Sequence, residues 1–338
     1  MKNIKNSKKI GILKKIFIKI CRKLGFEIID QNTFEIITIN KKEISTLGKT
    51  SINLPLGIVN ITRPVKALDI IIRTCSNVNM LTQNKKRIFE REKIEYTIRT
   101  IVSLLNSIKF SSQLKNIKIN FTVIDYNSSK ENLEKIKSIF KKFDKNFKLI
   151  NLEISNFEKM IDKFNERGEK VSINQISNMA NINQSLLEAK NAQDLIYFVE
   201  DDYLHQKNSI EEMIFTYERI SSQLNKEIII CPTDYPYLYT KTELTQNFLG
   251  KNLHWRKVNE SLCTFLTSKL IIEKYWDKYL SMCKKEHAPF EKPMHDIYEK
   301  ELCISPIPSL AVHYTNINSI FGLSPNIDWK KLWEENEI

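Results

Sequence analysis

The chain has 338 residues, of which 42% are apolar and 27% charged, so it can bury a sizeable core and disorder is not expected. Its formal net charge is +12, but nine positive charges fall in residues 1–26, which leaves +3 for the other 312 residues. A nucleic-acid-binding body would carry a broad basic face. We therefore expect no nucleic-acid partner and seek a local explanation for the basic N-terminal segment.

The six cysteines are scattered, and none forms a CxxC pair or a spacing that suggests a zinc site. Such spacing is typical of reduced thiols in a cytoplasmic protein. No apolar run reaches the roughly 18 residues that span a bilayer. The N-terminus also lacks the uninterrupted apolar region and cleavage site of a secretory signal.

Residues 8–24 show the periodicity of an amphipathic helix, and Gly25 suits its C-terminal stop. One stripe is apolar and the opposite side carries five basic residues, Lys8, Lys15, Lys19, Arg22 and Lys23. This combination is typical of helices that lie on anionic membranes, which would place the protein on the inner face of a membrane. The alternative is an ordinary helix that packs its apolar stripe on the body, and the pattern leaves both open.

The rest of the chain divides into a connector or small subdomain at 27–65 and a large domain at 66–338. The connector contains weak strand patterns at 34–39 and 58–61. From residue 66, apolar strands alternate with amphipathic helices, which predicts a mostly parallel sheet covered on both faces. The predicted strands are 68–72, 117–124, 147–154, 195–199, 227–231, 261–266 and 304–314, and the predicted helices begin near residues 87, 130, 173, 209 and 268. Pro306 and Pro308 suggest that the last strand lies at an edge.

Polar residues follow three of these strands, where ligands bind in parallel sheets. The segments are Arg73-Thr74-Cys75-Ser76-Asn77, Asp125-Tyr126-Asn127-Ser128-Ser129 and Glu200-Asp201-Asp202. Two carboxylates two residues apart at a strand end can share a hard divalent cation such as Mg²⁺ or Mn²⁺, which neutralises a diphosphate. The alternative is a solvated acidic turn before the next helix.

The segment from Asn178 to Met213 resembles the central region of family 2-type GT-A glycosyltransferases. It has their asparagine- and alanine-bearing helix, apolar strand and acidic triplet, with Glu200 in the first place of the DxD-like motif. The resemblance implies a Rossmann-like, mostly parallel mixed sheet, with a nucleotide-sugar half at 66–205 and an acceptor half at 206–338. It also implies that Asp202 binds the metal and that Glu200 and Asp201 lie at the cofactor.

The same resemblance extends to other segments in order. Arg73, Thr74 and Asn77 correspond to the loop that cradles the donor, and Asp125 corresponds to the nucleotide-binding aspartate. Alternatives remain: Asp125 can start an Asx turn, and Arg73 can form a surface ion pair. His313 is a candidate further metal ligand, although a lone histidine after a strand is more often simply hydrogen-bonded.

An inverting transfer needs a carboxylate that deprotonates the acceptor hydroxyl. The family places an acid before a helix on the acceptor side, and Asp296 lies there. Its alternative is a helix-end acid with a dipole role.

Acceptor binding is assigned to residues 232–260, which are rich in aromatic side chains that can stack on sugars. Tyr237, Trp255 and Arg256 are the candidates, with a buried anchor and a surface charge as the alternative for the last two.

The sequence thus predicts a metal-dependent hexosyltransferase that uses a nucleoside diphosphate sugar, UDP-linked by preference, and a glycan or lipid-linked acceptor in surface polysaccharide or glycolipid synthesis. A sugar-phosphate nucleotidyltransferase is the first alternative, although residues 73–77 contain no glycine for a phosphate loop. The second is a non-catalytic peripheral membrane scaffold with the same fold.

Overall fold

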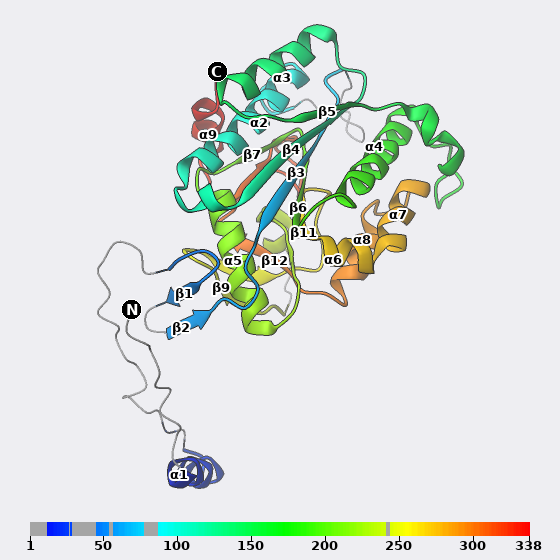
Figure 1. Cartoon of the computed structure of the whole chain (residues 1–338). Coiled ribbons are helices and arrows are strands. Elements are labelled where there is room, and N and C mark those ends of the chain that lie inside the picture. Colours follow the sequence, from blue (N-terminus) through cyan, green and yellow to red (C-terminus); the bar gives the residue numbers. More distant parts are fainter. Residues whose placement is uncertain (1–11, 27, 29–44, 54–56, 78–86, 241–243) are drawn as a thin grey trace. The chain divides into compact units, whose positions relative to one another are not determined.

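The computed structural model describes residues 12–26, 28, 45–53, 57–77, 87–240 and 244–338. The chain divides into two compact units, Met1–Ile44 with Ile52–Ile58, and Ser45–Ser51 with Val59–Ile338. The second unit contains the large sheet and its helices (Figure 1). The boundaries predicted at residues 26 and 65 remain predictions, and the strand predicted at 34–39 lies outside the described residues.

A nine-stranded sheet runs through the second unit in the order β5-β4-β3-β6-β11-β8-β12-β10-β9. All its strands point the same way except β11 and β10, which are antiparallel to their neighbours. The strands are β3 (Ala67–Thr74), β4 (Lys118–Asp125), β5 (Lys148–Asn151), β6 (Leu195–Glu200), β8 (Ile229–Ile230), β9 (Asn247–Leu249), β10 (His254–Lys257), β11 (Phe265–Ser268) and β12 (Cys303–Ile307). The predicted fold class, a mostly parallel mixed sheet flanked by helices, is confirmed.

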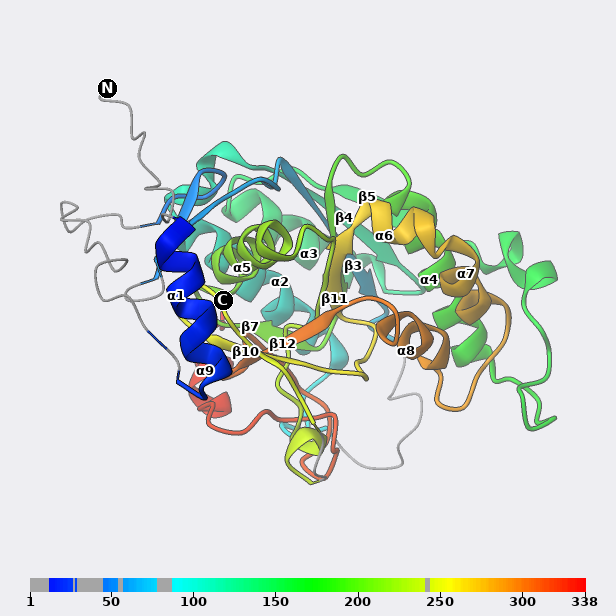
Figure 2. The ribbon, with the colours of Figure 1, turned by 90° about the horizontal axis from the view of Figure 1, so that it is seen from below.

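Helices cover both faces of this sheet (Figures 1 and 2). One face carries α2 (Lys93–Phe110), α3 (Lys130–Lys142) and α5 (Ser209–Leu224). The other carries α4 (Ile173–Ala189), α6 (Lys269–Lys274), α7 (Trp276–Lys284) and α8 (Lys292–Tyr298). Neighbouring strand residues point to opposite faces, so Ile70 and Ile72 pack under α2 while Ile71 packs under α4. Burial on both sides explains why these strands are apolar at nearly every position.

Shorter elements complete the described chain. They are β1 (Thr50–Asn53), β2 (Gly57–Asn60), the 3₁₀ turns Gln113–Asn116, Ile154–Asn156, Glu158–Met160 and Pro236–Tyr239, and the C-terminal α9 (Trp329–Glu335). A second small sheet pairs β7 (Tyr203–His205) with β13 (Ala311–His313). This pairing brings His313 opposite Tyr203, directly after the acidic triplet.

Two local predictions are wrong. The strand predicted at 304–314 is two strands, and β12 lies inside the sheet between β8 and β10 rather than at its edge. Proline is tolerated there because the β8 pairing covers only Cys303 and Ile304, so Pro306 lies beyond it. The helix expected from Arg87 begins at Lys93, which leaves Arg87 in the preceding segment.

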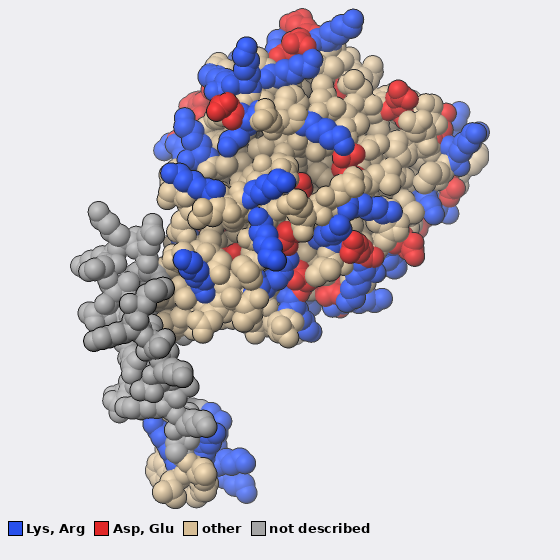
Figure 3. Space-filling view, in the orientation of Figure 1, with Lys and Arg blue, Asp and Glu red and all other residues tan. Residues whose placement is uncertain are grey.

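In the first unit, Ile12–Lys23 forms the helix α1, inside the range predicted as amphipathic, while residues 8–11 lie outside the described residues. None of its residues is buried, and Ile12, Leu13 and Phe17 are exposed. Figure 3 shows the basic side chains of α1 on one side and uncharged ones on the other. No helix in the described part of the chain is both long and apolar enough to cross a bilayer.

An aromatic cluster fixes α9 and the segment before α2. Trp333 of α9 stacks on Phe89 with ring centroids 4.3 Å apart and meets the edge of Tyr96 at 4.7 Å. The Arg99 guanidinium lies over the Trp333 ring at 4.4 Å. Since Trp333 is buried, the C-terminal helix is part of the folded body.

Replacing Trp333 by alanine should therefore remove a large buried contact and lower the free energy of unfolding by about 3 kcal/mol. Urea unfolding followed by circular dichroism measures this change. The control is Glu334→Ala, whose side chain is exposed on the same helix, and a shift of no more than about 0.5 kcal/mol is expected. Equal effects of the two variants would contradict the packing role of Trp333.

Candidate active site

A cavity of about 480 Å³ opens at the carboxyl ends of β3 and β6, where open parallel sheets bind ligands. Its walls come from the ends of these strands, from α4, from the segment before α2, from the residue before α8 and from the β13 region. The residues that matter most are Arg73, Arg87, Lys93, Asn178, Glu200, Asp201, Asp202, Glu291 and His313. The sequence-predicted triplet thus lies in a cavity and not on a solvated turn.

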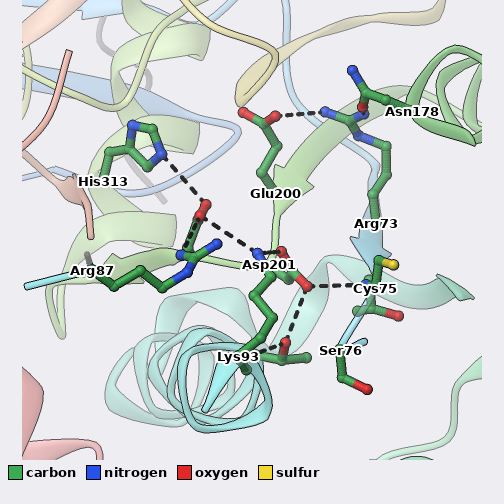
Figure 4. A network of polar contacts seen from close by, with 12 residues as sticks. Arg73, Cys75, Ser76, Arg87, Lys93, Asn178, Glu200, Asp201 and His313 are labelled. Atoms are coloured by element: carbon green, nitrogen blue, oxygen red, sulfur yellow. Dashed lines mark hydrogen bonds and ion pairs between the residues drawn. The ribbon is translucent and has the colours of Figure 1, made fainter. Parts of the chain in front are cut away.

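Glu200 forms an ion pair with Arg73, with Oε1 and Nη2 2.9 Å apart. The other terminal nitrogen of Arg73, Nη1, donates to Oδ1 of Asn178 at 2.8 Å (Figure 4). Burial disfavours the charged guanidinium, but Glu200 and the other acidic groups around it, Asp201 among them, together raise the pKa of Arg73. Arg73 is therefore a buried, fixed cation, which excludes the surface ion pair considered from the sequence.

Asp201 is bound on all sides by protein groups. Its Oδ1 lies 2.5 Å from Nζ of Lys93, and its Oδ2 accepts hydrogen bonds from the Cys75 N–H and the Thr97 hydroxyl, each at 3.1 Å. The carboxylate consequently joins β6 to the end of β3 and to α2. The sequence predicts that Asp201 lies at the cofactor. The geometry makes Asp201 an anchor of the cavity wall, because both of its oxygens already bind protein groups.

Asp202 uses its two oxygens differently. Oδ2 faces Nη1 of Arg87 at 3.0 Å and Nζ of Lys93 at 3.6 Å, whereas Oδ1 faces Nε2 of His313 at 3.5 Å. Burial would raise the pKa of Asp202, but Lys93, His313 and Arg87 together hold that pKa well below its usual range. Asp202 is therefore a carboxylate with one oxygen paired to cations and the other directed at a histidine.

His313 is held in place from two sides. Its ring stacks on Tyr203 at 4.5 Å with an angle of 3° between the planes, and Nδ1 lies 2.7 Å from the Phe321 carbonyl oxygen. That hydrogen bond requires the proton on Nδ1, so Nε2 is the ring nitrogen that faces Asp202. Burial lowers the pKa of His313, but the charges of Asp202 and Glu200, together with its hydrogen bonds, raise it overall, so Nε2 must lose its proton before its electron pair can bind a metal ion. With Nε2 deprotonated, Asp202 and His313 offer one oxygen and one nitrogen ligand, which fit Mn²⁺ or Mg²⁺. In the described residues, no third His, Cys, Asp or Glu joins such a group.

Asp125 is buried, and its two oxygens are occupied by its own loop. Oδ1 accepts from the hydroxyls of Thr74 and Ser128 at 2.7 and 2.6 Å, and Oδ2 accepts from the Ser128 N–H at 3.1 Å. Burial raises the pKa of this carboxyl. These bonds place Asp125 as a turn-forming aspartate, the alternative reading, and tie Thr74 to the same turn. Asn77 is exposed and donates to the Asn127 carbonyl, so it braces the two loops.

None of the three residues predicted to bind the acceptor lines the cavity. Trp255 has no exposed surface and belongs to the core under α5. Arg256 forms an ion pair with Asp234 and lies over the Tyr239 ring. Tyr237 is buried and donates its hydroxyl proton to the Glu260 carbonyl. The rings of Trp255 and Tyr237 serve packing, which residue type alone cannot distinguish from sugar stacking.

The predicted base, Asp296, also lies outside the cavity lining. It lies on the outer side of α8, where its side chain is 40% exposed and pairs with Nζ of Lys278 at 2.6 Å. That hydrogen bond lowers the pKa of Asp296, which weakens it as a base. Glu291, one residue before α8, lines the cavity instead. Burial, together with the neighbouring Glu200 charge, raises the pKa of Glu291 to about 7.

The sequence reasoning missed Arg87, Lys93 and Glu291. The sequence predicts both in one long helix from residue 87, whereas α2 starts at Lys93, and both side chains line the cavity. For Glu291 a signal existed: it is an acid directly before a short helix that begins with Lys292-Pro293. Asp296 is five residues further along, and its carboxylate faces Lys278 rather than the cavity.

No family model matches the chain, and no curated protein sequence matches it. Three solved structures illustrate the likenesses in fold. The S. aureus TarS crystal structure matches 62% of this chain and 29% of its own, at 12% identity and a TM-score of 0.35. The galactosyltransferase LgtC, solved with donor and acceptor sugar analogs, matches 68% of this chain and 66% of its own, at 13% identity and a TM-score of 0.35. The chain thus spans under a third of TarS and about two thirds of LgtC.

The third is a nucleoside-diphosphate-sugar pyrophosphorylase from Vibrio cholerae RC9, with 70% of this chain and 90% of its own matched at 12% identity and a TM-score of 0.35. Likenesses this weak do not decide between a transferase and a pyrophosphorylase. The fold is described without these likenesses, by the strand order, the helices on both faces of the sheet and the acidic triplet after β6. The fold is of the GT-A type. Within this GT-A domain the chemistry must be inferred from the cavity itself.

Glu291 should make the stability of the GT-A domain depend on pH. Its pKa is about 7 in the folded protein and 4.5 as the ordinary value, so between these pH values the native state holds a proton that the unfolded state has lost. Stability then falls as pH rises from 4.5 to 7, by roughly 3 kcal/mol for this one group. Glu291→Gln cannot ionise and should be more stable than the wild type at pH 8 but not at pH 4.5.

Urea unfolding at pH 4.5 and pH 8 measures this difference. Asp296→Asn is the matched control, because it removes an exposed carboxylate of the same helix region. A Glu291→Gln advantage that is equal at both pH values would show that Glu291 titrates normally.

Proposed function

We propose that the protein is a glycosyltransferase that moves a hexose from a nucleoside diphosphate sugar, UDP-linked by preference, to a hydroxyl of a glycan or lipid-linked acceptor, with inversion. The observation that supports this best is the meeting, in one cavity, of the strand-end carboxylates with Glu291, a buried carboxylate whose pKa is about 7. The strand-end carboxylates suit a cation that binds the diphosphate of a donor, and Glu291 suits deprotonation of a hydroxyl.

On the donor side, this chain offers fixed groups of both charges. Arg73, oriented by Glu200 and Asn178, presents a buried guanidinium at the cavity wall. Asp202 and His313 would hold a divalent cation through Oδ1 and Nε2, and such an ion supplies positive charge for a departing diphosphate. Tyr126, which also lines the cavity, offers an aromatic surface to a nucleotide base or sugar.

On the acceptor side, Glu291 would take the proton of the attacking hydroxyl. The acceptor oxygen then bonds to the anomeric carbon as the bond from that carbon to the diphosphate oxygen breaks, and the electron pair leaves with the nucleoside diphosphate. A base works best when its pKa lies near the operating pH, which burial achieves for Glu291. Asp296, exposed and paired with Lys278, offers no comparable basicity.

The same carboxylate favours a transferase over a nucleotidyltransferase. A sugar phosphate that attacks a nucleotide is already an anion and needs no base, whereas a sugar hydroxyl does. A cavity with a carboxylate tuned to about pH 7 therefore suits a hydroxyl acceptor. The products separate the two reactions, because a transferase releases nucleoside diphosphate and a nucleotidyltransferase releases pyrophosphate.

Binding and turnover of UDP-, GDP-, CMP- and dTDP-sugars, with and without Mn²⁺, test the proposal. We expect one nucleotide class to bind and to release nucleoside diphosphate slowly with water as acceptor. Glu291→Gln should lower that release by roughly 10²–10⁴-fold while nucleotide affinity changes little. The wild-type rate should rise with pH up to about 7, because Glu291 acts only after losing its proton.

Asp296→Asn is the control and should retain the release rate. If Asp296→Asn lost activity and Glu291→Gln did not, the base would be misassigned. If no nucleotide bound under any condition, a non-catalytic scaffold would be the better explanation.

We also propose that α1 attaches the protein to an anionic membrane on the cytoplasmic side. An exposed apolar stripe beside Lys15, Lys19 and Lys23 supports this proposal. Membranes with anionic lipids attract such a basic side, and the apolar stripe inserts at the headgroup boundary. A lipid-linked acceptor would then be met at the membrane surface.

Sedimentation with anionic vesicles should therefore retain the full chain and release a chain that starts at Glu27. Neutral vesicles should retain much less of the full chain, since each basic residue near an anionic surface contributes about 1 kcal/mol. Equal sedimentation of the two chains would exclude this role for α1.

A further inference from the structure

We propose that Arg87 and Lys93 bind the diphosphate of the donor, and that their ion pairs with Asp202 and Asp201 couple diphosphate binding to cation binding. The inference rests on the proposed function and adds two residues to its site. The strand-end carboxylates of the cavity are already paired with cations of the chain, and a bound donor would have to change these pairs.

One part of the cavity wall consists of ion pairs between side chains of the chain itself. Three carboxylates, Glu200, Asp201 and Asp202, face three cations, Arg73, Lys93 and Arg87. The side chains of Arg87 and Lys93 are only 11% and 14% exposed, and both line the cavity (Figure 4). An unpaired charge is costly in such a poorly solvated place. A bound diphosphate or metal ion would therefore need a partner from these side chains, which now pair with one another.

The diphosphate and the divalent cation would each replace one partner in the same ion pairs. A guanidinium and an ammonium are the side chains that bind phosphate oxygens most strongly, and here they hold Oδ2 of Asp202 and Oδ1 of Asp201. If a diphosphate draws Arg87 and Lys93 away, Asp202 loses the cations at its Oδ2 and its charge becomes available to a divalent cation. If a cation binds Asp202 first, Arg87 becomes available to the diphosphate. Each ligand therefore favours the other, and the coupling is reciprocal.

Arg87 does not depend on Asp202 for its position. Its guanidinium lies 4.9 Å from the centre of the Tyr96 ring, and the Tyr96 hydroxyl accepts the N–H of Phe89, whose ring is clamped by Trp333. Lys93 is the first residue of the 18-residue α2, whose N-terminal end favours anions. Both cations would thus remain at the cavity after their carboxylate partners turn to a metal ion.

Arg73 is a weaker candidate for this exchange. It is held by Glu200 on one nitrogen and by the Asn178 amide on another, and neither partner is a proposed ligand of the cation. Among the described residues of the wall, Arg73 is therefore a fixed cation, whereas Arg87 and Lys93 are exchangeable.

The test measures free Mn²⁺ by electron paramagnetic resonance in titrations of the full chain, alone and with saturating UDP or inorganic pyrophosphate. For the wild type, either anion should tighten Mn²⁺ binding by about tenfold. In Arg87→Gln, Mn²⁺ alone should bind more tightly than to the wild type, because Asp202 has lost its competitor, and the enhancement by the anions should largely disappear. Lys93→Gln should act in the same direction.

Two further variants control the experiment. Arg87→Lys keeps the charge without the two-pronged geometry and should retain part of the enhancement. Lys278→Gln removes a lysine that also pairs with an aspartate, but outside the cavity, and should behave as the wild type. Arg87→Gln and Lys93→Gln proteins with the full wild-type enhancement would overturn the inference.

The two anions separate this inference from the proposed function. If nucleotides bound the wild type and all variants equally well, the proposed function would stand, but Arg87 and Lys93 would not be the residues that bind the diphosphate. Pyrophosphate coupling that depends on Arg87, together with no binding of any nucleotide in the panel, would support the exchange and remove the glycosyltransferase proposal.

Discussion

The buried carboxylate of Asp201 and its ion pair with Lys93 connect the elements of the site. The ion pair joins the first turn of α2 to the end of β6, and the same carboxylate also binds the backbone after β3 and the hydroxyl of Thr97. Removing two charges from water is costly, and such a pair is tolerated when the remaining oxygens are satisfied as they are here. Because Asp201 is fixed, its neighbours Glu200 and Asp202 are forced to opposite sides of the strand end, one toward Arg73 and the other toward His313.

The aromatic cluster at the C-terminal helix extends this constraint to the cations. Phe89 lies between Trp333 and Tyr314, and the Tyr314 N–H donates to the backbone carbonyl of Asp202. The segment that carries Arg87 and the strand that carries the acidic triplet are thus attached to the same packed rings. A helix near the end of the chain, which touches no part of the cavity, consequently helps to set the charge geometry inside it.

The acidic groups in and near the cavity differ in chemistry because they differ in surroundings. Asp202 is surrounded by cations and keeps its negative charge, whereas Glu291 is buried beside another carboxylate and holds its proton up to about pH 7. Asp296, five residues further along, is exposed to water and to Lys278. Separated pKa values of this kind are what divide charge stabilisation from base catalysis within a single site.

The sequence by itself determined the class of fold and the place of the site. Strands such as 195–199, apolar at every position, can be stable only when buried on both faces, and an acidic triplet after such a strand must lie at the ligand-binding edge of a parallel sheet. The helix start predicted near residue 130 likewise agrees with α3, whose N-cap Ser129 accepts the N–H of Asn132. These conclusions depend on periodicity and neighbours in the chain, which a single sequence contains.

Only the tertiary structure decided which side chains share the cavity. Trp255 and Tyr237 have the residue types of sugar-binding groups but lie in the core, and their burial depends on helices far away in the sequence. Arg87 and Lys93 reach Asp202 across more than a hundred residues. The direction of a helical side chain changes by about 100° per residue, so whether Glu291 or Asp296 faces the cavity follows from how α8 packs and not from its composition.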